Sequence, residues 1–198
     1  MSSETELKYT PHNGFFAKEL FECEYIAPYA GLLRRISMST EYLDTKDRLA
    51  AKSGITLRRR YENGESVIYA KTNKSSHGAL SVRGEWSVAS EDTDVAARLL
   101  CNVGAPVEEL CDLPLVTVAS VRFERLECLV TPYPGFSFML SYDEGVFGEK
   151  LPFSEVELEL CDGSVSELTV FGEKLASRLG LTPETRSKYA RALSAPLS

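Results

Sequence analysis

The stretch 155–160 reads Glu-Val-Glu-Leu-Glu-Leu, and this strict alternation of charged and aliphatic residues decides the fold class. Side chains of a β-strand point alternately to two faces, so three carboxylates line one face of this segment and three aliphatic side chains line the other. Ionised carboxylates only accept hydrogen bonds and repel one another, so the cluster indicates a bound cation. Hard oxygen ligands without a nearby histidine or cysteine favour Mg²⁺ or Mn²⁺ over zinc.

Other segments of the chain alternate in the same way. Glu4, Glu6 and Lys8 share one face of the segment 4–9. Basic residues also sit on single faces of alternating segments, and they are Arg58, Arg60, Lys71, Arg83 and Arg122. For any one strand, the solvent-exposed face of an ordinary antiparallel sheet explains such a pattern. Across the chain, however, acids and bases are concentrated, whereas a solvated sheet would intersperse neutral polar residues. The combination favours a site that holds a metal ion and a polyanion together.

The alternation predicts about eight strands, mostly antiparallel, with four helices between and after them. The predicted strands cover residues 4–9, 37–44, 55–61, 66–72, 80–88, 116–130, 136–143 and 154–160. Asn63-Gly64 predicts a tight hairpin, and a turn is expected at 143–145. Helices are predicted over residues 13–22, 93–103, 164–180, where Ser164 and Glu167 form a capping box, and from 182 onward, with Pro183 in the first position.

The composition is that of an ordinary globular protein. The 198 residues are 43% hydrophobic and 26% charged, so we expect one domain spanning residues 1–198. A formal charge of −7 argues against nucleic acid or an anionic membrane as a partner. The five scattered cysteines form no C-x-x-C pair and are expected to be free thiols. The sequence shows no signal peptide and no membrane-spanning stretch, which predicts a cytoplasmic protein.

The motifs follow one another in the order of a known family. The sequence resembles the CYTH superfamily, also called the triphosphate tunnel metalloenzymes. The matching segments are Glu4-x-Glu6-x-Lys8, Tyr42-Leu43-Asp44-Thr45, Leu57-Arg58-Arg59-Arg60, Lys71, Arg83-Gly84-Glu85-Trp86, Arg122, Asp143, residues 155–159 and Ser187-Lys188-Tyr189. Two positions depart from the family pattern. Glu124 stands where members often carry a second base, and Glu144 follows Asp143. A regular strand would turn Arg125 to the face opposite Arg122.

The resemblance implies a mainly β (α+β) fold, a closed eight-stranded antiparallel β-barrel tunnel with helices packed outside. Apolar faces would turn outward beneath the helices, and charged faces would turn inward. The residues expected to bind substrate are Lys8, Arg58, Arg60, Lys71, Arg83, Arg122 and Lys188. The residues expected to bind Mg²⁺ or Mn²⁺ are Glu4, Glu6, Asp143, Glu155, Glu157 and Glu159. The catalytic set would be Glu4, Glu6, Lys8, Glu157 and Glu159.

The activity implied by the resemblance is metal-dependent hydrolysis of the terminal phosphate of a triphosphate. Inorganic triphosphate, cleaved to pyrophosphate and orthophosphate, is the leading substrate. Thiamine triphosphate and nucleoside triphosphates are alternatives, because they undergo the same chemistry. A class IV adenylyl cyclase would need a base-and-ribose pocket, which no sequence feature requires. A non-catalytic polyphosphate-binding module would not need two acidic strands. The organic part of the substrate and the oligomeric state stay open.

Overall fold

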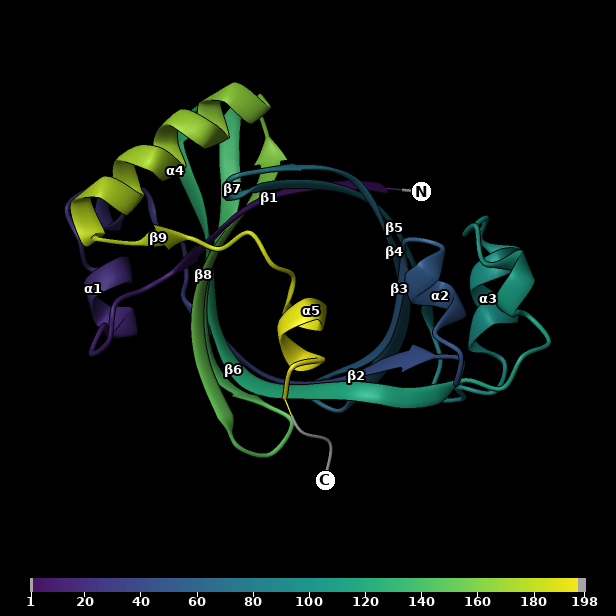
Figure 1. The fold of residues 1–198 in the computed structure, drawn as a ribbon. Helices are drawn as coiled ribbons and strands as arrows, with labels where there is room; N and C mark the ends of the chain where they lie inside the picture. Colours follow the sequence, from purple (N-terminus) through teal and green to yellow (C-terminus); the bar gives the residue numbers. More distant parts are fainter. Residues whose placement is uncertain (1, 196–198) are drawn as a thin grey trace.

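Eight long antiparallel strands close into a barrel in the computed structural model, which describes residues 2–195, except for the side chains of residues 2 and 73–76 (Figure 1). The strands are β1 (Ser2–Thr10), β2 (Arg34–Asp44), β3 (Ile55–Glu62), β4 (Glu65–His77), β5 (Leu80–Ala89), β6 (Val116–Tyr133), β7 (Phe136–Phe147), β8 (Leu151–Asp162) and the two-residue β9 (Thr182–Pro183). Their order is β5-β4-β3-β2-β6-β7-β8-β1, and β1 also pairs with β5. The predicted closed eight-stranded barrel is therefore confirmed.

Strand β1 closes the barrel because it has a partner along each edge. One edge pairs with β5, where Glu4 lies opposite Arg83. The other edge pairs with β8, where Glu6 lies opposite Glu159 and Lys8 lies opposite Glu157. The N-terminal and C-terminal charged motifs, about 150 residues apart in the chain, thus become neighbours in the sheet.

Most helices cover the outside of the barrel, as predicted (Figure 1). The helices are α1 (Ala17–Phe21), α2 (Leu49–Lys52), α3 (Ala96–Asn102), α4 (Val165–Leu179), α5 (Lys188–Ala192) and the 3₁₀ helices η1 (Ala27–Tyr29) and η2 (Glu108–Leu110). On one side, Leu168 and Leu175 of α4 pack on Leu7 and Leu158. On the other side, α2 and α3 cover a second apolar cluster on β3 and β4. The outward faces of the strands therefore form two cores beneath helices.

Helix α4 begins and ends as the sequence predicts. Ser164 accepts a hydrogen bond from the Glu167 backbone, and the Glu167 side chain accepts one from the Ser164 backbone. Gly180 ends the helix with a φ of 64°, a conformation that favours glycine. Helices α1 and α3 are shorter than predicted, because they begin at residues 17 and 96.

The prediction that a last helix begins at Pro183 is wrong. Pro183 lies in β9, opposite Tyr9, and the backbone of Glu184 donates to the Lys8 carbonyl at 3.0 Å. Helix α5 begins only after Ser187, whose side chain accepts a hydrogen bond from the Ala190 backbone. Figure 1 shows α5 within the outline of the barrel, so this helix is an exception to the expectation that helices pack outside.

The predicted turn at 143–145 is also wrong, because β7 continues to Phe147. Gly145 has another purpose. A Cβ atom there would lie 2.0 Å from the Arg122 carbonyl oxygen and 2.5 Å from the Cα of Phe123. Glycine is needed here because β6 and β7 approach each other closely, not because the chain reverses.

Two further features bear on the predictions from composition. The five cysteines are free, as expected. Over the part of the chain that the structure describes, no helix is long and apolar enough to cross a membrane.

Candidate active site in the barrel interior

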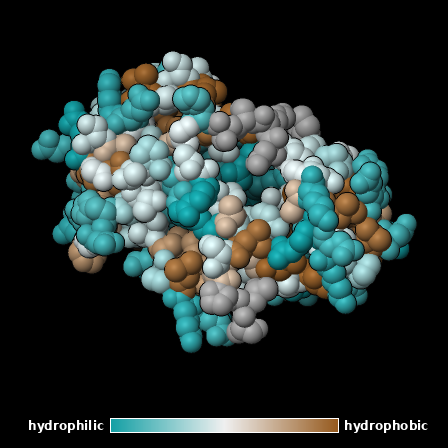
Figure 2. All heavy atoms as spheres, in the orientation of Figure 1, coloured by the Kyte–Doolittle hydropathy of each residue, from teal (hydrophilic) through white to brown (hydrophobic). Residues whose placement is uncertain are grey.

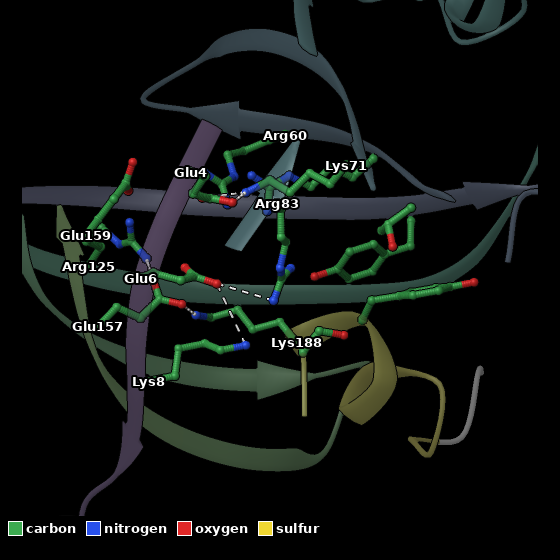
Figure 3. A pocket seen from close by; sticks show the side chains of 15 residues that line it. Glu4, Glu6, Lys8, Arg60, Lys71, Arg83, Arg125, Glu157, Glu159 and Lys188 are labelled. Carbon is green, nitrogen blue, oxygen red and sulfur yellow. Dashed lines mark hydrogen bonds and ion pairs between the residues drawn. The ribbon is translucent and has the colours of Figure 1, made fainter. Parts of the chain in front are cut away.

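A cavity in the barrel interior gathers most of the charged residues that the sequence singled out (Figure 3). Its lining consists of Glu4, Glu6, Lys8, Tyr42, Thr56, Arg58, Arg60, Lys71, Arg83, Arg125, Glu157, Glu159, Ser187, Lys188 and Tyr189. Among these described residues, seven are basic and four are acidic. Figure 2, in the same orientation as Figure 1, shows hydrophilic side chains around the central hollow. The excess of basic groups suits an anionic ligand.

The carboxylates of the cavity come from the adjacent strands β1 and β8, and we call Glu4, Glu6, Glu157 and Glu159 the acidic wall. Burial and the nearby Glu157 and Glu4 raise the pKa of Glu6. Partial desolvation, with Glu4 as the next cause, raises the pKa of Glu159 to about 7. For these two carboxylates, burial and repulsion from neighbouring carboxylates therefore outweigh the attraction of the nearby basic groups. A divalent cation would relieve that repulsion.

Two carboxylates of the acidic wall are instead well compensated. Glu4 receives the Lys71 ammonium at 2.6 and 2.7 Å, and although burial opposes it, Lys71 lowers the Glu4 pKa. Burial likewise opposes ionisation of Glu157, but Lys188 and Arg125 hold its pKa well below the usual range. Lys71 also reaches Glu85 at 2.7 Å. Both Glu4 and Glu157 are therefore ionised and present oxygens to the cavity.

The guanidinium groups of Arg58 and Arg60 project from β3, which lies four strands from β8 around the barrel. Both stack on Tyr69, at 4.7 and 5.5 Å from its ring centroid. Among the described residues, their buried Nε atoms have no hydrogen-bond partner. Burial and the neighbouring cations Arg58 and Arg125 lower the pKa of Arg60. These arginines therefore present donors that a bound anion would satisfy.

A buried ion-pair network lies beneath the cavity. The Lys188 ammonium on α5 contacts Glu157 at 2.8 Å, Asp143 at 2.9 Å and Glu155. Arg125 binds Asp143 through two parallel hydrogen bonds of 2.7 and 2.8 Å and reaches Glu157 at 2.5 Å. Burial raises the pKa of Glu155 to about 7, although Lys188 opposes this shift. The network anchors α5 to β6, β7 and β8.

Comparison with known proteins agrees with this geometry. The model of the CYTH domain matches residues 3–193, which is nearly the whole chain. The chain belongs to the CYTH family. A curated relative, an inorganic triphosphatase of Haemophilus influenzae, is 27% identical over 172 residues, which cover 85% of this chain and 49% of that protein. This CYTH chain therefore spans about half the length of that relative.

Solved structures share the fold of this CYTH domain at low sequence identity. A putative adenylyl cyclase from Hippeastrum, described as having a dominant triphosphatase activity, has a TM-score of 0.70, with 15% identity and coverage of 98% and 97% of the two chains. A protein from Pyrococcus horikoshii has a TM-score of 0.60 at 23% identity, with coverage of 96% and 98%. These likenesses support the triphosphate tunnel fold.

One predicted substrate ligand of the CYTH domain lies elsewhere. Arg122 is exposed on the outer face of β6, whereas Arg125 faces the cavity. The expectation that Arg122 faces inward and Arg125 outward is thus wrong. It assumed that the apolar residues of β6 face outward, but Val121 and Phe123 face inward and pack with α5 residues such as Ala192. The apolar packing of α5 inside the barrel therefore determines which residues of β6 face inward.

The other predicted site residues fall into two groups. Those that line the cavity are Glu4, Glu6, Lys8, Arg58, Arg60, Lys71, Arg83, Glu157, Glu159 and Lys188. Asp143 and Glu155 are fully buried behind it. Oxygens of Asp143, Glu155 and Glu157 lie within 4.8 Å of one another and could hold a metal ion. The Lys188 ammonium contacts all three, so an ion could enter this group only if Lys188 moved.

Several residues of the site were not assigned a role from sequence. Arg191 and Glu184 join the buried network. Tyr42 and Tyr189, which belong to matching motifs, lie in the cavity wall with tilted rings whose centroids are 4.9 Å apart. The spacing of Lys188 and Arg191, three residues apart on one helix, is a signal that could have indicated Arg191, since such residues share a face. For Glu184, in the connection between β9 and α5, the sequence offers no such pattern.

Proposed function

We propose that this CYTH domain hydrolyses the terminal phosphate of a triphosphate, with inorganic triphosphate as the leading substrate. The observation that carries the proposal is that one cavity contains both arginine donors without hydrogen-bond partners in the described part of the chain and carboxylates whose charge is poorly compensated. Arg58 and Arg60 present buried Nε donors without partners among the described residues. Glu6 and Glu159 are carboxylates whose pKa values are raised by burial and by their acidic neighbours. A polyphosphate bound together with divalent cations satisfies both groups.

The chemistry of the acidic wall fits Mg²⁺ or Mn²⁺. Glu4, Glu6, Glu157 and Glu159 offer hard oxygen donors, and no histidine or cysteine lines the cavity among the described residues. When bound, such an ion would neutralise charge on phosphoryl oxygens and lower the pKa of an attacking water. Asp143 and Glu155, also predicted as ligands, would act from behind, because Lys188 and Arg191 already bind them.

The basic residues of the cavity would bind and orient the phosphates. Arginine offers a planar fork of donors to phosphate oxygens, whereas lysine acts as a point charge. Arg83, which contacts Glu6 at 3.3 Å, and Lys71, which contacts Glu4, link the acidic wall to the phosphate-binding residues. Burial lowers the pKa of Lys8, which lies 3.8 Å from Glu6 and so sits at the junction of the metal and phosphate sites. Each phosphate group would thus be held between cations of the protein and metal ions.

Two observations support inorganic triphosphate as the substrate. The Haemophilus influenzae relative is an inorganic triphosphatase, and the Hippeastrum protein is described as having a dominant triphosphatase activity. The cavity wall is almost wholly charged and polar, so it offers little apolar surface to a nucleobase or a thiamine ring. This composition favours inorganic triphosphate over thiamine triphosphate and nucleoside triphosphates, and over a cyclase reaction.

The proposal is tested by phosphate release from inorganic triphosphate, thiamine triphosphate and ATP, each with Mg²⁺ or Mn²⁺. We expect inorganic triphosphate to give the highest kcat/KM, EDTA to abolish release, and either metal to restore it. Excess Ca²⁺ should inhibit, because it is larger and tolerates looser geometry around the same oxygens. Full activity after thorough metal removal would exclude the metal-dependent reaction. Tight binding of inorganic triphosphate without turnover would indicate a binding module instead.

A further inference from the structure

Arg191 is a buried cation of this chain that does not line the cavity. It lies on α5, and its Nη2 atom donates to Oε2 of Glu155, while its Nη1 atom lies 3.3 Å from Oε2 of Glu184. Its guanidinium stacks over Phe147 at 5.0 Å and over Phe153 at 5.3 Å. Arg191 and Glu155 are both buried, so the attraction between them is weakly screened.

A continuous series of ion pairs leads from Arg191 to the acidic wall. Glu155 is shared between Arg191 and Lys188, each of which contacts a different carboxylate oxygen. Lys188 in turn contacts Oε1 of Glu157 at 2.8 Å. The other oxygen of Glu157 contacts Arg125 at 2.5 Å. The orientation of Glu157 at the cavity therefore depends on Lys188, and the position of Lys188 depends on Glu155.

Arg191 fixes Glu155 from the side opposite the cavity. Lys188 and Arg191 are three residues apart on α5 and so reach Glu155 from one face of the helix. Glu184 contacts Arg191, and its backbone donates to the carbonyl of Lys8, a residue of the cavity. Without Arg191, both Glu155 and Glu184 would lose a buried cationic partner. Lys188 would then be free to shift toward Glu155, whose charge would no longer be balanced by Arg191.

We propose that Arg191 is a positioning residue: it holds Glu155, and through Lys188 holds Glu157, in the orientation that binds the metal–triphosphate complex. This inference rests on the proposed triphosphatase function. Residues that orient metal ligands typically change metal affinity or activity by about 10- to 100-fold when they are replaced. Arg191 does not contact the cavity, so its loss should act on the metal and on kcat rather than on capture of the triphosphate.

The test compares Arg191→Met, Arg191→Lys and the control Arg178→Met. Arg178 is an exposed arginine that also stacks on an aromatic ring, at 5.0 Å from the Tyr25 centroid. With inorganic triphosphate, Arg191→Met should lower kcat by about 10- to 100-fold and raise the Mn²⁺ concentration for half-maximal activity, with KM changing less than about threefold. Arg191→Lys keeps one charge beside Glu155 and should fall between Arg191→Met and the unmodified protein. Arg178→Met should match the unmodified protein.

A second readout does not depend on turnover. Mn²⁺ binding, measured by electron paramagnetic resonance with inorganic triphosphate present, should weaken by about 10-fold or more in Arg191→Met and less in Arg191→Lys. If the unmodified protein hydrolyses no triphosphate, the proposed function fails, while this binding comparison still decides the role of Arg191. Circular dichroism identifies variants that are folded. If Arg191→Met does not fold, Arg191→Lys is compared with Glu184→Gln instead. Arg191→Lys should then show the larger loss of Mn²⁺ affinity.

Three results would overturn the proposal. One is a folded Arg191→Met protein with unchanged kcat and unchanged Mn²⁺ affinity, which would make the ion pairs of Arg191 purely structural. Another is a rise in KM alone, which would mean that Arg191 contacts the triphosphate directly. Loss of stability without loss of Mn²⁺ affinity in Arg191→Lys would likewise contradict a positioning role.

Discussion

The barrel interior contains two regions of opposite character. Around the cavity, inward positions carry charges, and burial leaves Glu6 with a raised pKa and Arg58 with a donor atom that lacks a partner in the described structure. Against Ala192 of α5, inward positions are apolar, and Val121 and Phe123 pack there in a core beside the ion pairs of Lys188 and Arg191. The first region presents charged groups to an open cavity, whereas the second is filled by side chains of the protein itself. The difference locates the part of the barrel in which we propose that the reaction takes place.

The border between the two regions runs along single strands. On β6, Phe123 packs with α5, and Arg125, two residues later on the same face, enters the ion-pair network. On β8, Phe153 and Glu155 show the same succession. The cavity is therefore not a hollow through a uniform tunnel. The protein fills one part of the interior with its own helix and leaves a cavity lined by charged and polar side chains in the other part.

The largest effect on this comparison should come from the acidic wall. Glu157→Gln keeps the shape of the side chain but removes a charge that Lys188 and Arg125 hold ionised, so we expect kcat for inorganic triphosphate to fall by roughly 100-fold or more. The matched control is Glu144→Gln, an exposed glutamate on β7 that should leave kcat unchanged. Phosphate-release kinetics measure both. Equal, mild effects of the two changes on kcat would indicate that the acidic wall is an ordinary solvated surface without a catalytic role.

A smaller effect, on KM, should separate the inner arginines from the outer one. Arg60→Ala removes charge-assisted hydrogen bonds to phosphate, each worth about 1.5–3 kcal/mol, so KM should rise by roughly 10- to 100-fold. Arg122→Ala removes an exposed arginine of β6 and should change KM less than about twofold. Initial rates over a range of triphosphate concentrations test the pair. A similar rise for Arg122→Ala would restore it as a substrate ligand.

The smallest effect should appear in the pH dependence of metal binding. Burial raises the pKa of Glu159 from its ordinary 4.5 to about 7, so the folded protein binds this proton more tightly than the unfolded chain does. The resulting stabilisation of the metal-free fold is fully present below about pH 4.5 and is lost as the pH rises through about 7. Mn²⁺ binds the ionised form, so the Mn²⁺-induced rise in Tm should be larger at about pH 8 than at about pH 6, by roughly 2 °C, because solvent screens this exposed side chain.

Thermal unfolding with EDTA or with Mn²⁺ at both pH values measures this difference. Glu159→Gln serves as the control, since the glutamine side chain cannot ionise and the difference between the Mn²⁺ shifts at the two pH values should become smaller. A Mn²⁺ shift in the unmodified protein that is larger at the lower pH would contradict the assigned direction.

The charged region was largely predictable from sequence, because strand alternation is a strong constraint. Glu4 and Glu6, or Arg58 and Arg60, are two residues apart and must share a face of any regular strand. Closure of the barrel then makes that face the interior. Alternation alone does not say whether the charged face lies inside the barrel or in solvent. The family resemblance predicted that it lies inside.

The apolar region was not predictable, because alternation says which residues share a face but not which face is inside. Phe123 and Arg125 share one face of β6, and Arg122 shares the other with Glu124. Only the position of α5 decides between them, and the helix itself was expected to begin at Pro183 and to pack outside. Gly145 misled for a related reason, since glycine marks close approach of strands as well as turns.

The double pairing of β1 has a consequence for how the chain folds. Because β1 precedes the other strands in the chain, it finds one of its partners, β8, only after residues 151–162 have emerged. Until then, the edge of β1 that pairs with β8 stays open. Contacts between segments so distant in sequence slow folding, and an unpaired edge invites association with other chains. Closure should therefore be late and cooperative, and the amide protons of β1 that bond to β8 should be protected from exchange only when the whole ring has formed.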